Sequence, residues 1–228
     1  MSDNVVELGA SHGSAKGLVI DWDYVALGGF ARLYKACESA LKDSKVVLTP
    51  ALFASKLLGA PLAAGLAAVS GADGEALAEK VQEEYLTSLA DAAETPRAEV
   101  LALAKEMAAK GLKVGVVTEL SADFIQPVLA GLGLADAVVV SDTPAVAGGF
   151  GLKTWRRVPH EMKLAEQMGV ALVASNFSLK AAMSSNLGTI AVPAAETSFQ
   201  DFGGADMVAD EFSSAIAETI LCALRIEA

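Results

Sequence analysis

The sequence has few cysteines, few basic residues and few aromatic residues, and each shortage excludes a class of protein. Its only cysteines among 228 residues are Cys37 and Cys222, which lie far apart and lack metal-ligand spacing. We interpret them as thiols of a reducing compartment rather than a disulfide. Seventeen Lys and Arg face 28 Asp and Glu, for a net charge of −11. Such a surface repels phosphate backbones, so no nucleic-acid partner is expected.

Long apolar runs are also missing. The longest uncharged stretch, residues 57–72, contains proline and glycine and is shorter than the ~20 apolar residues that a membrane span requires. The N-terminal segment lacks a basic start followed by an apolar run, so no secretory signal is expected. These features predict a cytoplasmic protein without a membrane partner, and they leave the oligomeric state open.

Hydrophobic residues are abundant, at 53% of the chain, and many fall in short β-branched runs. Each run is continuous rather than alternating, which is typical of strands buried on both faces. The runs lie at 17–20, 113–117, 137–140, 171–174, 189–192 and 206–209. Helical patterns separate the later runs, and this alternation predicts an α/β fold with a doubly wound, Rossmann-like parallel sheet.

Capping residues suggest where the helices lie. The segment 96–110 has apolar residues at helical spacing and is followed by Gly111. Pro159 is expected to open a further helix that ends at Gly169, and Ser178 is expected to cap the next one. The last helix is expected near 211–225.

Residues 30–92 interrupt the strand–helix pattern. This segment is rich in alanine and leucine and contains no convincing strand. We predict a helical cap at 30–92, inserted into an α/β core formed by 1–29 and 93–228.

Polar side chains follow several predicted strands, at the sheet edge where ligands of open α/β folds bind. Asp21 and Asp23 follow the first strand, Thr118 and Glu119 follow the second, and Ser175 and Asn176 follow the fourth. A basic loop adds Lys153, Arg156 and Arg157. Together they suit an anionic substrate, most simply a phosphate, with a metal cation balancing the carboxylates. The plainer alternatives are solvated acids on a turn and a solvated basic loop.

The order of several motifs resembles the haloacid dehalogenase (HAD) superfamily, specifically its β-phosphoglucomutase-like branch with a helical cap. The motifs read "VIDWDYV" at 19–25, "VGVVT" at 114–118, "GLKTWRRVPHEMKLAEQMGV" at 151–170 and "LKAAMSSNLGTIAVP" at 179–193. The segment "GADMVADEF" at 204–212 is similar to the last strand of that family.

The resemblance implies a role for each matching residue. Asp21 would be the nucleophile that takes up a phosphoryl group, and Asp23 the general acid and base. Thr118 would bind the phosphoryl oxygens, with Glu119 beside it in the substrate site. Either Lys153 or Arg156 would neutralise the nucleophile and the phosphate.

The chain departs from the family pattern at the fourth motif, where one or two aspartates normally complete a magnesium site. Here Ser175 and Asn176 stand in their place, which leaves Asp21, the backbone carbonyl of Asp23 and the side-chain oxygen of Asn176 as metal ligands. One lost unit charge at ~4 Å is worth about 4 kcal/mol at an effective dielectric constant of ~20. The resemblance therefore implies a weakened magnesium site. Tyr24, where the family has glycine, adds bulk at the mouth.

Two functions follow from this pattern. The first is a HAD-type phosphohydrolase, a phosphatase or phosphosugar mutase-like enzyme, that acts on a small phosphorylated metabolite through an aspartyl-phosphate on Asp21. The alternative is a catalytically impaired protein of the same fold with a binding or regulatory role.

Overall fold

The computed structural model describes residues 15–226, and most of the N-terminal segment considered for a secretory signal lies outside them. Its centre is a six-stranded sheet in which all strands are parallel, in the order β3-β2-β1-β4-β5-β6. The strands are β1 (Ala15–Asp21), β2 (Lys113–Thr118), β3 (Val138–Ser141), β4 (Leu164–Val173), β5 (Gly188–Ala191) and β6 (Met207–Val208). Each strand overlaps a predicted run, and the predicted α/β fold is confirmed.

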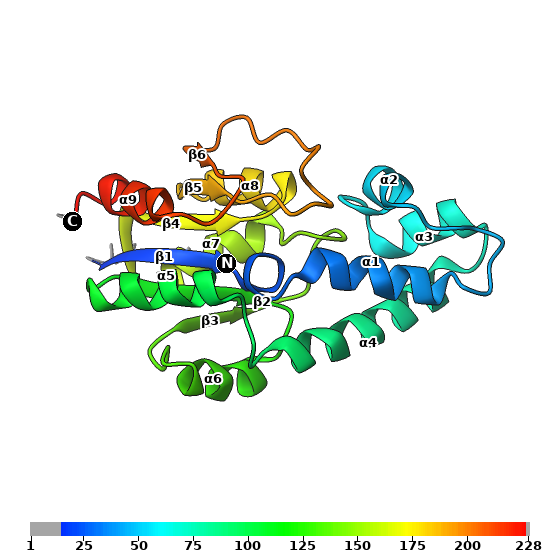
Figure 1. Ribbon diagram of the computed structural model, residues 1–228, viewed down its shortest axis with the longest axis horizontal. Coiled ribbons are helices and arrows are strands. Elements are labelled where there is room, and N and C mark those ends of the chain that lie inside the picture. Colours follow the sequence, from blue (N-terminus) through cyan, green and yellow to red (C-terminus); the bar gives the residue numbers. More distant parts are fainter. Residues whose placement is uncertain (1–14, 227–228) are drawn as a thin grey trace, which may run out of the picture.

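The central strands are apolar because both of their faces are covered. Leu18, Val19 and Ile20 of β1 are 0% exposed. Full burial of a side chain of this size contributes roughly 1.5–3 kcal/mol, which explains the continuous hydrophobic runs. Helices lie on both faces of the sheet (Figure 1). They are α5 (Ala98–Ala109), α6 (Ala122–Gly131), α7 (Leu152–Glu161), α8 (Asn176–Met183) and α9 (Ser214–Ala223).

The prediction that a helix begins at Pro159 and ends at Gly169 is wrong. Pro159 lies inside α7, near its end, and residues from Leu164 onward belong to β4. The apolar side chains that pack α7 against the core, Trp155 and Val158, precede the proline in the sequence. The start of β4 is irregular, with a register shift against β1 and a positive φ at Gln167. Its sequence therefore lacks the continuous apolar run of a buried strand and was predicted to be helical.

The expected cap at Ser178 is also wrong, by one helical turn. Helix α8 begins at Asn176, and its N-cap is Ser175, whose hydroxyl accepts a hydrogen bond from the Ser178 N–H at 3.2 Å. Both serines fit the pattern of an N-cap, and the end of the preceding strand selects the first of them.

Residues 29–92 form a helical block at one end of the molecule (Figure 1). Its elements are α1 (Gly29–Ala40), α2 (Pro50–Leu52), the π-helical turn η2 (Phe53–Leu57), α3 (Leu62–Ser70) and α4 (Gly74–Ala92). Helix α4 packs against both α1 and α3. Since β1 leads directly towards α1, the block lies beyond the carboxyl ends of the strands.

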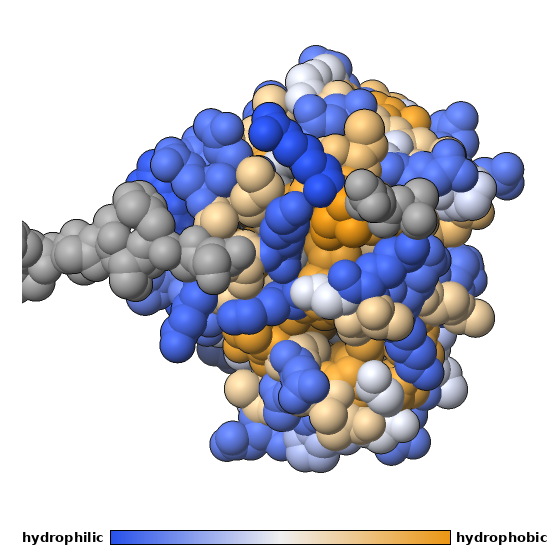
Figure 2. All heavy atoms as spheres, turned by 90° about the vertical axis from the view of Figure 1, so that its left-hand side faces the viewer, coloured by the Kyte–Doolittle hydropathy of each residue, from blue (hydrophilic) through white to orange (hydrophobic). Residues whose placement is uncertain are grey.

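The opposite end of the molecule, shown in Figure 2, has polar residues interspersed with apolar ones. Within residues 15–226, no helix has the length and hydropathy needed to cross a membrane.

Candidate functional site

The carboxyl ends of the central strands meet where the sheet faces the helical block. Asp21 is the last residue of β1 and pairs in register with Val117 of β2, and Thr118 pairs with Ser141 of β3. A π-helical turn, η1 (Trp22–Ala26), follows β1 directly. This turn puts both Asp21 and Asp23 in the interior, where each is 0% exposed.

The carboxylate of Asp23 is bound by two donors from the end of β2. The Thr118 hydroxyl donates to Oδ1 at 2.5 Å, and the Glu119 backbone N–H donates to Oδ2 at 2.6 Å. Burial raises the pKa of Asp23 from 3.8 to about 7, while these two hydrogen bonds oppose the shift. The Thr118 hydroxyl, which the resemblance predicts to bind phosphoryl oxygens, therefore donates to the protein's own carboxyl group.

Asp21 has no such support. Neither of its carboxyl oxygens has a hydrogen-bond partner, and both are buried. Burial raises its pKa well above the usual range, and the charges of Asp23 and Glu119 raise it further. Ser178 lies close enough to favour the ionised form, but its hydroxyl does not meet the geometry of a hydrogen bond. Burial therefore dominates, and it disfavours the ionised form of Asp21.

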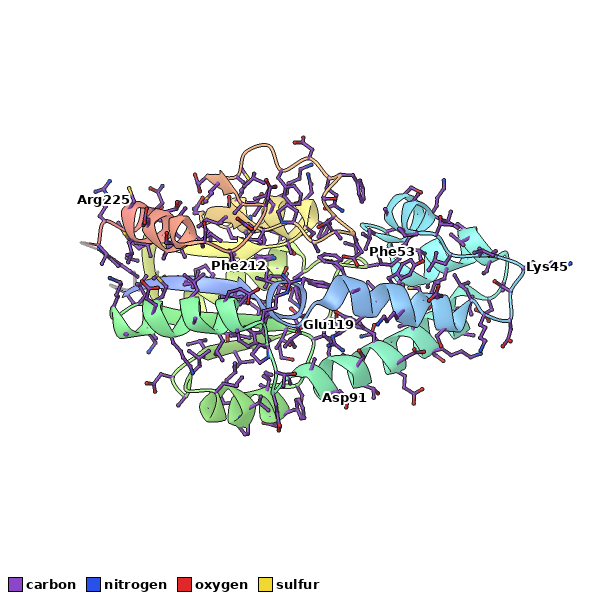
Figure 3. All side chains as sticks on the ribbon, viewed as in Figure 1. Lys45, Phe53, Asp91, Glu119, Phe212 and Arg225 are labelled. Carbon is purple, nitrogen blue, oxygen red and sulfur yellow. The ribbon has the colours of Figure 1, made fainter. Side chains whose placement is uncertain are left out.

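Glu119 connects the sheet to the helical block, and Figure 3 places it at the junction between them. Its Oε1 accepts a hydrogen bond from the Tyr24 hydroxyl at 3.3 Å, and its Oε2 accepts one from Gln82 Nε2 of α4 at 2.8 Å. Burial, and then the charge of Asp23, raise the pKa of Glu119 to about 8. Three acids thus share the junction.

Aromatic rings cover Asp21 and Asp23 on the side of the helical block. Tyr24 is 2% exposed, and its ring centroid lies 4.5 Å from that of Phe30. Tyr85 of α4 is also buried and approaches Gly29 so closely that a Cβ there would lie 2.8 Å from its hydroxyl and 2.8 Å from the Asp23 carbonyl. Only glycine fits this contact between the turn and the helical block.

A cavity of about 660 Å³ lies between the sheet edge and the helical block. Tyr24, Tyr85 and Glu119 separate it from the aspartates, because Asp21 and Asp23 do not line it. Its charged lining residues are Glu75, Glu79 and Glu119, and no Lys, Arg or His is among the residues that line it.

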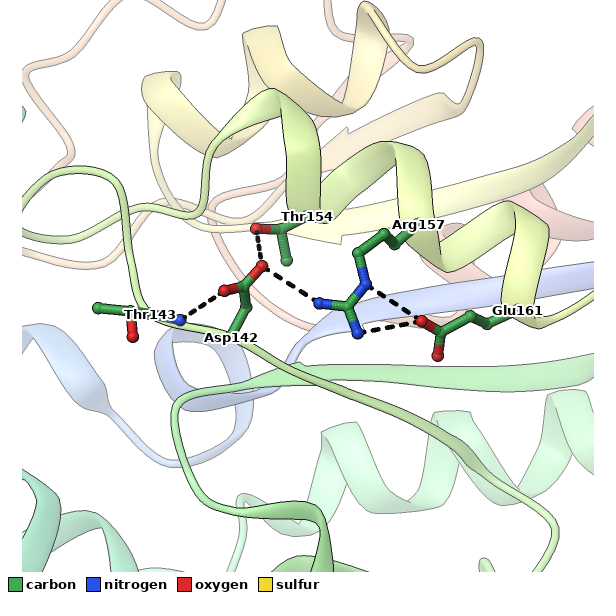
Figure 4. Close-up of polar contacts among 5 residues, drawn as sticks. All are labelled: Asp142, Thr143, Thr154, Arg157 and Glu161. Atoms are coloured by element: carbon green, nitrogen blue, oxygen red, sulfur yellow. Dashed lines mark hydrogen bonds and ion pairs between the residues drawn. The ribbon is translucent and has the colours of Figure 1, made fainter. Parts of the chain in front are cut away.

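The basic loop lies on helix α7, where Lys153 and Arg156 are exposed and form no hydrogen bond or ion pair within the described part of the chain. Arg157 pairs with Asp142 at 3.3 Å and with Glu161 at 3.0 Å (Figure 4). Thr154 also donates to Asp142, at 2.9 Å. Of the three cations, the structure therefore pairs Arg157 with neighbouring acids, and no described hydrogen bond or ion pair joins Lys153 or Arg156 to Asp21.

Asn176 is the first residue of α8, three residues after the end of β4, and its side chain bonds to the 200–201 loop. Its Nδ2 donates to the carbonyl of Asp201, and its backbone N–H donates to Gln200 Oε1 at 2.8 Å. Both contacts hold the start of α8 against the 200–201 loop.

The residues present do not fit the magnesium ion that the resemblance implies. The Asn176 side-chain amide bonds to the 201 carbonyl, and burial without a hydrogen bond disfavours the ionised Asp21 that a hard cation requires. Among residues 15–226, no group of three or more His, Cys, Asp or Glu is arranged to hold a metal.

Gln82, Tyr85 and Ser178 belong to the site, and sequence reasoning did not find them. The first two lie on one face of α4, whose pattern predicts a helix but not its contact with Glu119. Ser178 resembled a helix cap. Only the folded arrangement brings these side chains to the ends of β1 and β2.

No protein-family model matches the chain, and no curated protein matches it. Solved structures do match. CbbY from Rhodobacter sphaeroides in complex with phosphate is 17% identical, with a TM-score of 0.68 over 93% of this chain and 100% of that one. β-Phosphoglucomutase from Clostridium difficile is 15% identical, with a TM-score of 0.66 over 92% and 97%. A haloacid dehalogenase-like hydrolase from Streptococcus pneumoniae is 14% identical, with a TM-score of 0.60 over 90% and 98%.

These likenesses cover nearly the whole chain at low identity, so they show the fold. The protein has a haloacid dehalogenase-like fold of the β-phosphoglucomutase type, as the motif order predicted. The site residues depart from the motifs of that family at several points, and a shared fold does not fix the function of the site.

Proposed function

We propose that this chain is a ligand-binding protein of the HAD fold in which the aspartate pair has a structural role and phosphoryl transfer is impaired. The ligand site is the cavity between the helical block, acting as a cap, and the sheet edge. This is the second of the two functions that the sequence left open.

The observation that carries the proposal is the state of Asp21. A carboxyl group must be ionised to attack phosphorus, and an ionised carboxylate in the interior requires a cation or hydrogen-bond donors. Asp21 is 0% exposed, neither of its carboxyl oxygens accepts a hydrogen bond, and the nearby Ser178 hydroxyl offsets burial only in part. Its surroundings therefore oppose the ionised form that a nucleophile needs.

The cavity supports a binding role. A volume of about 660 Å³ lies within the usual range for small-molecule sites, and its walls combine apolar side chains with a few polar groups. It sits beyond the carboxyl ends of the strands, where ligands of open α/β folds bind.

A phosphohydrolase acting on a small phosphorylated metabolite is the second candidate, and one observation favours it. Asp23, with a pKa of about 7, suits a general acid and base two residues after a nucleophile. The solved structures with this fold include a phosphate complex and a β-phosphoglucomutase. This function requires Asp23 to leave Thr118, and magnesium to be held by Asp21, Asp23 and a reoriented Asn176.

A turnover assay separates the two candidates. Purified protein is incubated with a panel of phosphate monoesters and with magnesium, manganese or cobalt in excess, beside the Asp21→Asn variant as the matched control. We expect the two proteins to release phosphate at the same background rate. Metal-dependent release that Asp21→Asn abolishes would overturn the proposal and establish the phosphohydrolase.

A further inference from the structure

The cavity between the helical block and the sheet edge has an apolar wall to which both parts of the molecule contribute. Residues 61–63, a proline, a leucine and an alanine, line it from the helical block, and the apolar residues 144–147 line it from the loop after β3. Two backbone hydrogen bonds join these segments. The Gly59 N–H donates to the Ala147 carbonyl at 3.0 Å, and the Ala147 N–H donates to the Ala60 carbonyl at 2.9 Å. The two halves of the wall are therefore held together without using any side chain.

Two helices of the block extend this apolar surface. Leu33 of α1 and both Ala78 and Leu86 of α4 line the cavity. Ten of the 18 residues that line it within the described part of the chain are Ala, Val, Leu or Pro. Apolar surface that faces water in a concave site is stabilised when an apolar molecule covers it. The composition of the lining therefore favours a ligand with a large hydrocarbon part.

The charged groups of the lining do not provide a counter-charge in the interior. Glu119 accepts hydrogen bonds from the Tyr24 hydroxyl at 3.3 Å and from Gln82 at 2.8 Å, so its oxygens already have partners within the protein. Glu75 and Glu79 are exposed to solvent. No Lys, Arg or His is among the described residues that line the cavity. Because burying a charge without a partner is costly, the interior suits an uncharged ligand.

We propose that this cavity binds an uncharged, mainly apolar small molecule, which packs against the wall formed by residues 61–63 and 144–147. The ligand contacts both the helical block and the loop after β3, because the wall comes from both. The inference rests on the proposed function, since it names the ligand class of the same cavity. It departs from the phosphate that one solved structure of this fold contains.

Calorimetry with three probes that share one ring system tests this ligand class. The probes are 1-naphthalenemethanol, which is uncharged, 1-naphthylmethylammonium and 1-naphthylmethyl phosphate. We expect the alcohol to bind saturably and more tightly than either ion, by at least about ten-fold over the phosphate, because neither charge has a partner inside the cavity. Its affinity should not fall as salt is added. The heat capacity change on binding should be negative, which marks the burial of apolar surface.

Two cavity-filling variants and a matched control locate the bound probe. Ala78→Phe and Ala63→Phe each place a ring in the cavity, from two different helices, and each should weaken binding of the alcohol at least about ten-fold. Ala76→Phe is the control, since Ala76 is exposed on the same helix as Ala78 and does not line the cavity. It should leave the affinity unchanged. Melting temperatures show which variants fold, and the second filling variant decides the test where the first does not fold.

Binding of either ion as tightly as the alcohol would overturn the inference, as would the absence of binding by the alcohol. A filling variant that folds and binds the alcohol as the control does would also overturn it, because the probe would then lie outside the cavity. Release of phosphate from 1-naphthylmethyl phosphate with magnesium, lost in Asp21→Asn, would instead overturn the proposed function. The two failures are therefore distinguishable.

Discussion

The buried acids predict that the protein becomes less stable as pH rises through neutrality. The folded pKa is about 7 for Asp23 and about 8 for Glu119, against 3.8 and 4.5 without the fold. Between those values the folded state keeps protons that the unfolded chain has released. The free energy of unfolding therefore falls as pH rises above about 4, and it levels off only above the folded pKa values.

The size of the effect follows from the pKa difference. Each group contributes a slope of about 1.4 kcal/mol per pH unit while it is protonated only in the folded state. For Asp23 this amounts to about 3 kcal/mol between about pH 5 and about pH 7. In a chain of 228 residues, a loss of that size lowers the melting temperature by roughly 6–12 °C.

Urea unfolding at fixed ionic strength across this pH range measures the slope. Asp23→Asn and Glu119→Gln each remove one titrating group and should flatten it by about 1.4 kcal/mol per pH unit. Glu106→Gln, at an exposed position on α5, is the control and should leave the slope unchanged. If stability stays level or rises with pH, or if Asp23→Asn keeps the slope of the control, the burial argument is refuted.

Three further substitutions test the packing of Gly29 at the site and the ion pairs of Arg157 on α7. Gly29→Ala should destabilise the fold by about 1–3 kcal/mol, because its Cβ would lie 2.8 Å from the Tyr85 hydroxyl. Gly131→Ala, which meets nothing within 4 Å on α6, should instead be neutral or mildly stabilising, and equal losses in urea unfolding would contradict the packing argument. Arg157→Ala should cost under ~1 kcal/mol, because its ion pairs are partly exposed. A larger loss of unfolding free energy in the same assay would show that the contacts of Arg157 with Asp142 and Glu161 stabilise the core.

The sequence predicted the sheet better than it predicted the site. Continuous apolar runs are a local signal, so residues 17–20 and 113–117 could be placed in strands, and the aspartates at a strand end. The helix from Pro159 failed because the irregular start of β4 resembles helix in sequence. Helix α8 was expected a turn too late, since Ser175 and Ser178 both match a capping pattern.

The predicted site residues share an edge of the sheet, but their side-chain partners could not be predicted. Asp23 and Thr118 do meet, through a direct hydrogen bond. Lys153 is exposed on a helix, and Asn176 faces the 200–201 loop. Side-chain direction depends on the exact start of each helix, and that start is the least predictable feature of a sequence.

The helical block contributes site residues that no sequence motif predicted. Gln82 reaches Glu119 across the junction, and Tyr85 covers the turn that carries Asp23. These contacts join segments about 37 residues or more apart in the chain. Through these contacts, residues of a motif typical of phosphoryl transfer lie at a closed junction that contains three acidic side chains.

Titration of magnesium into the protein by calorimetry, beside Asp21→Asn, tests the central claim most directly. If Asp21 is a buried, protonated side chain without a metal, both proteins should give the same small heats of dilution at millimolar concentrations. Saturable magnesium binding that Asp21→Asn removes would contradict the account, because it would show that Asp21 is ionised and holds a cation.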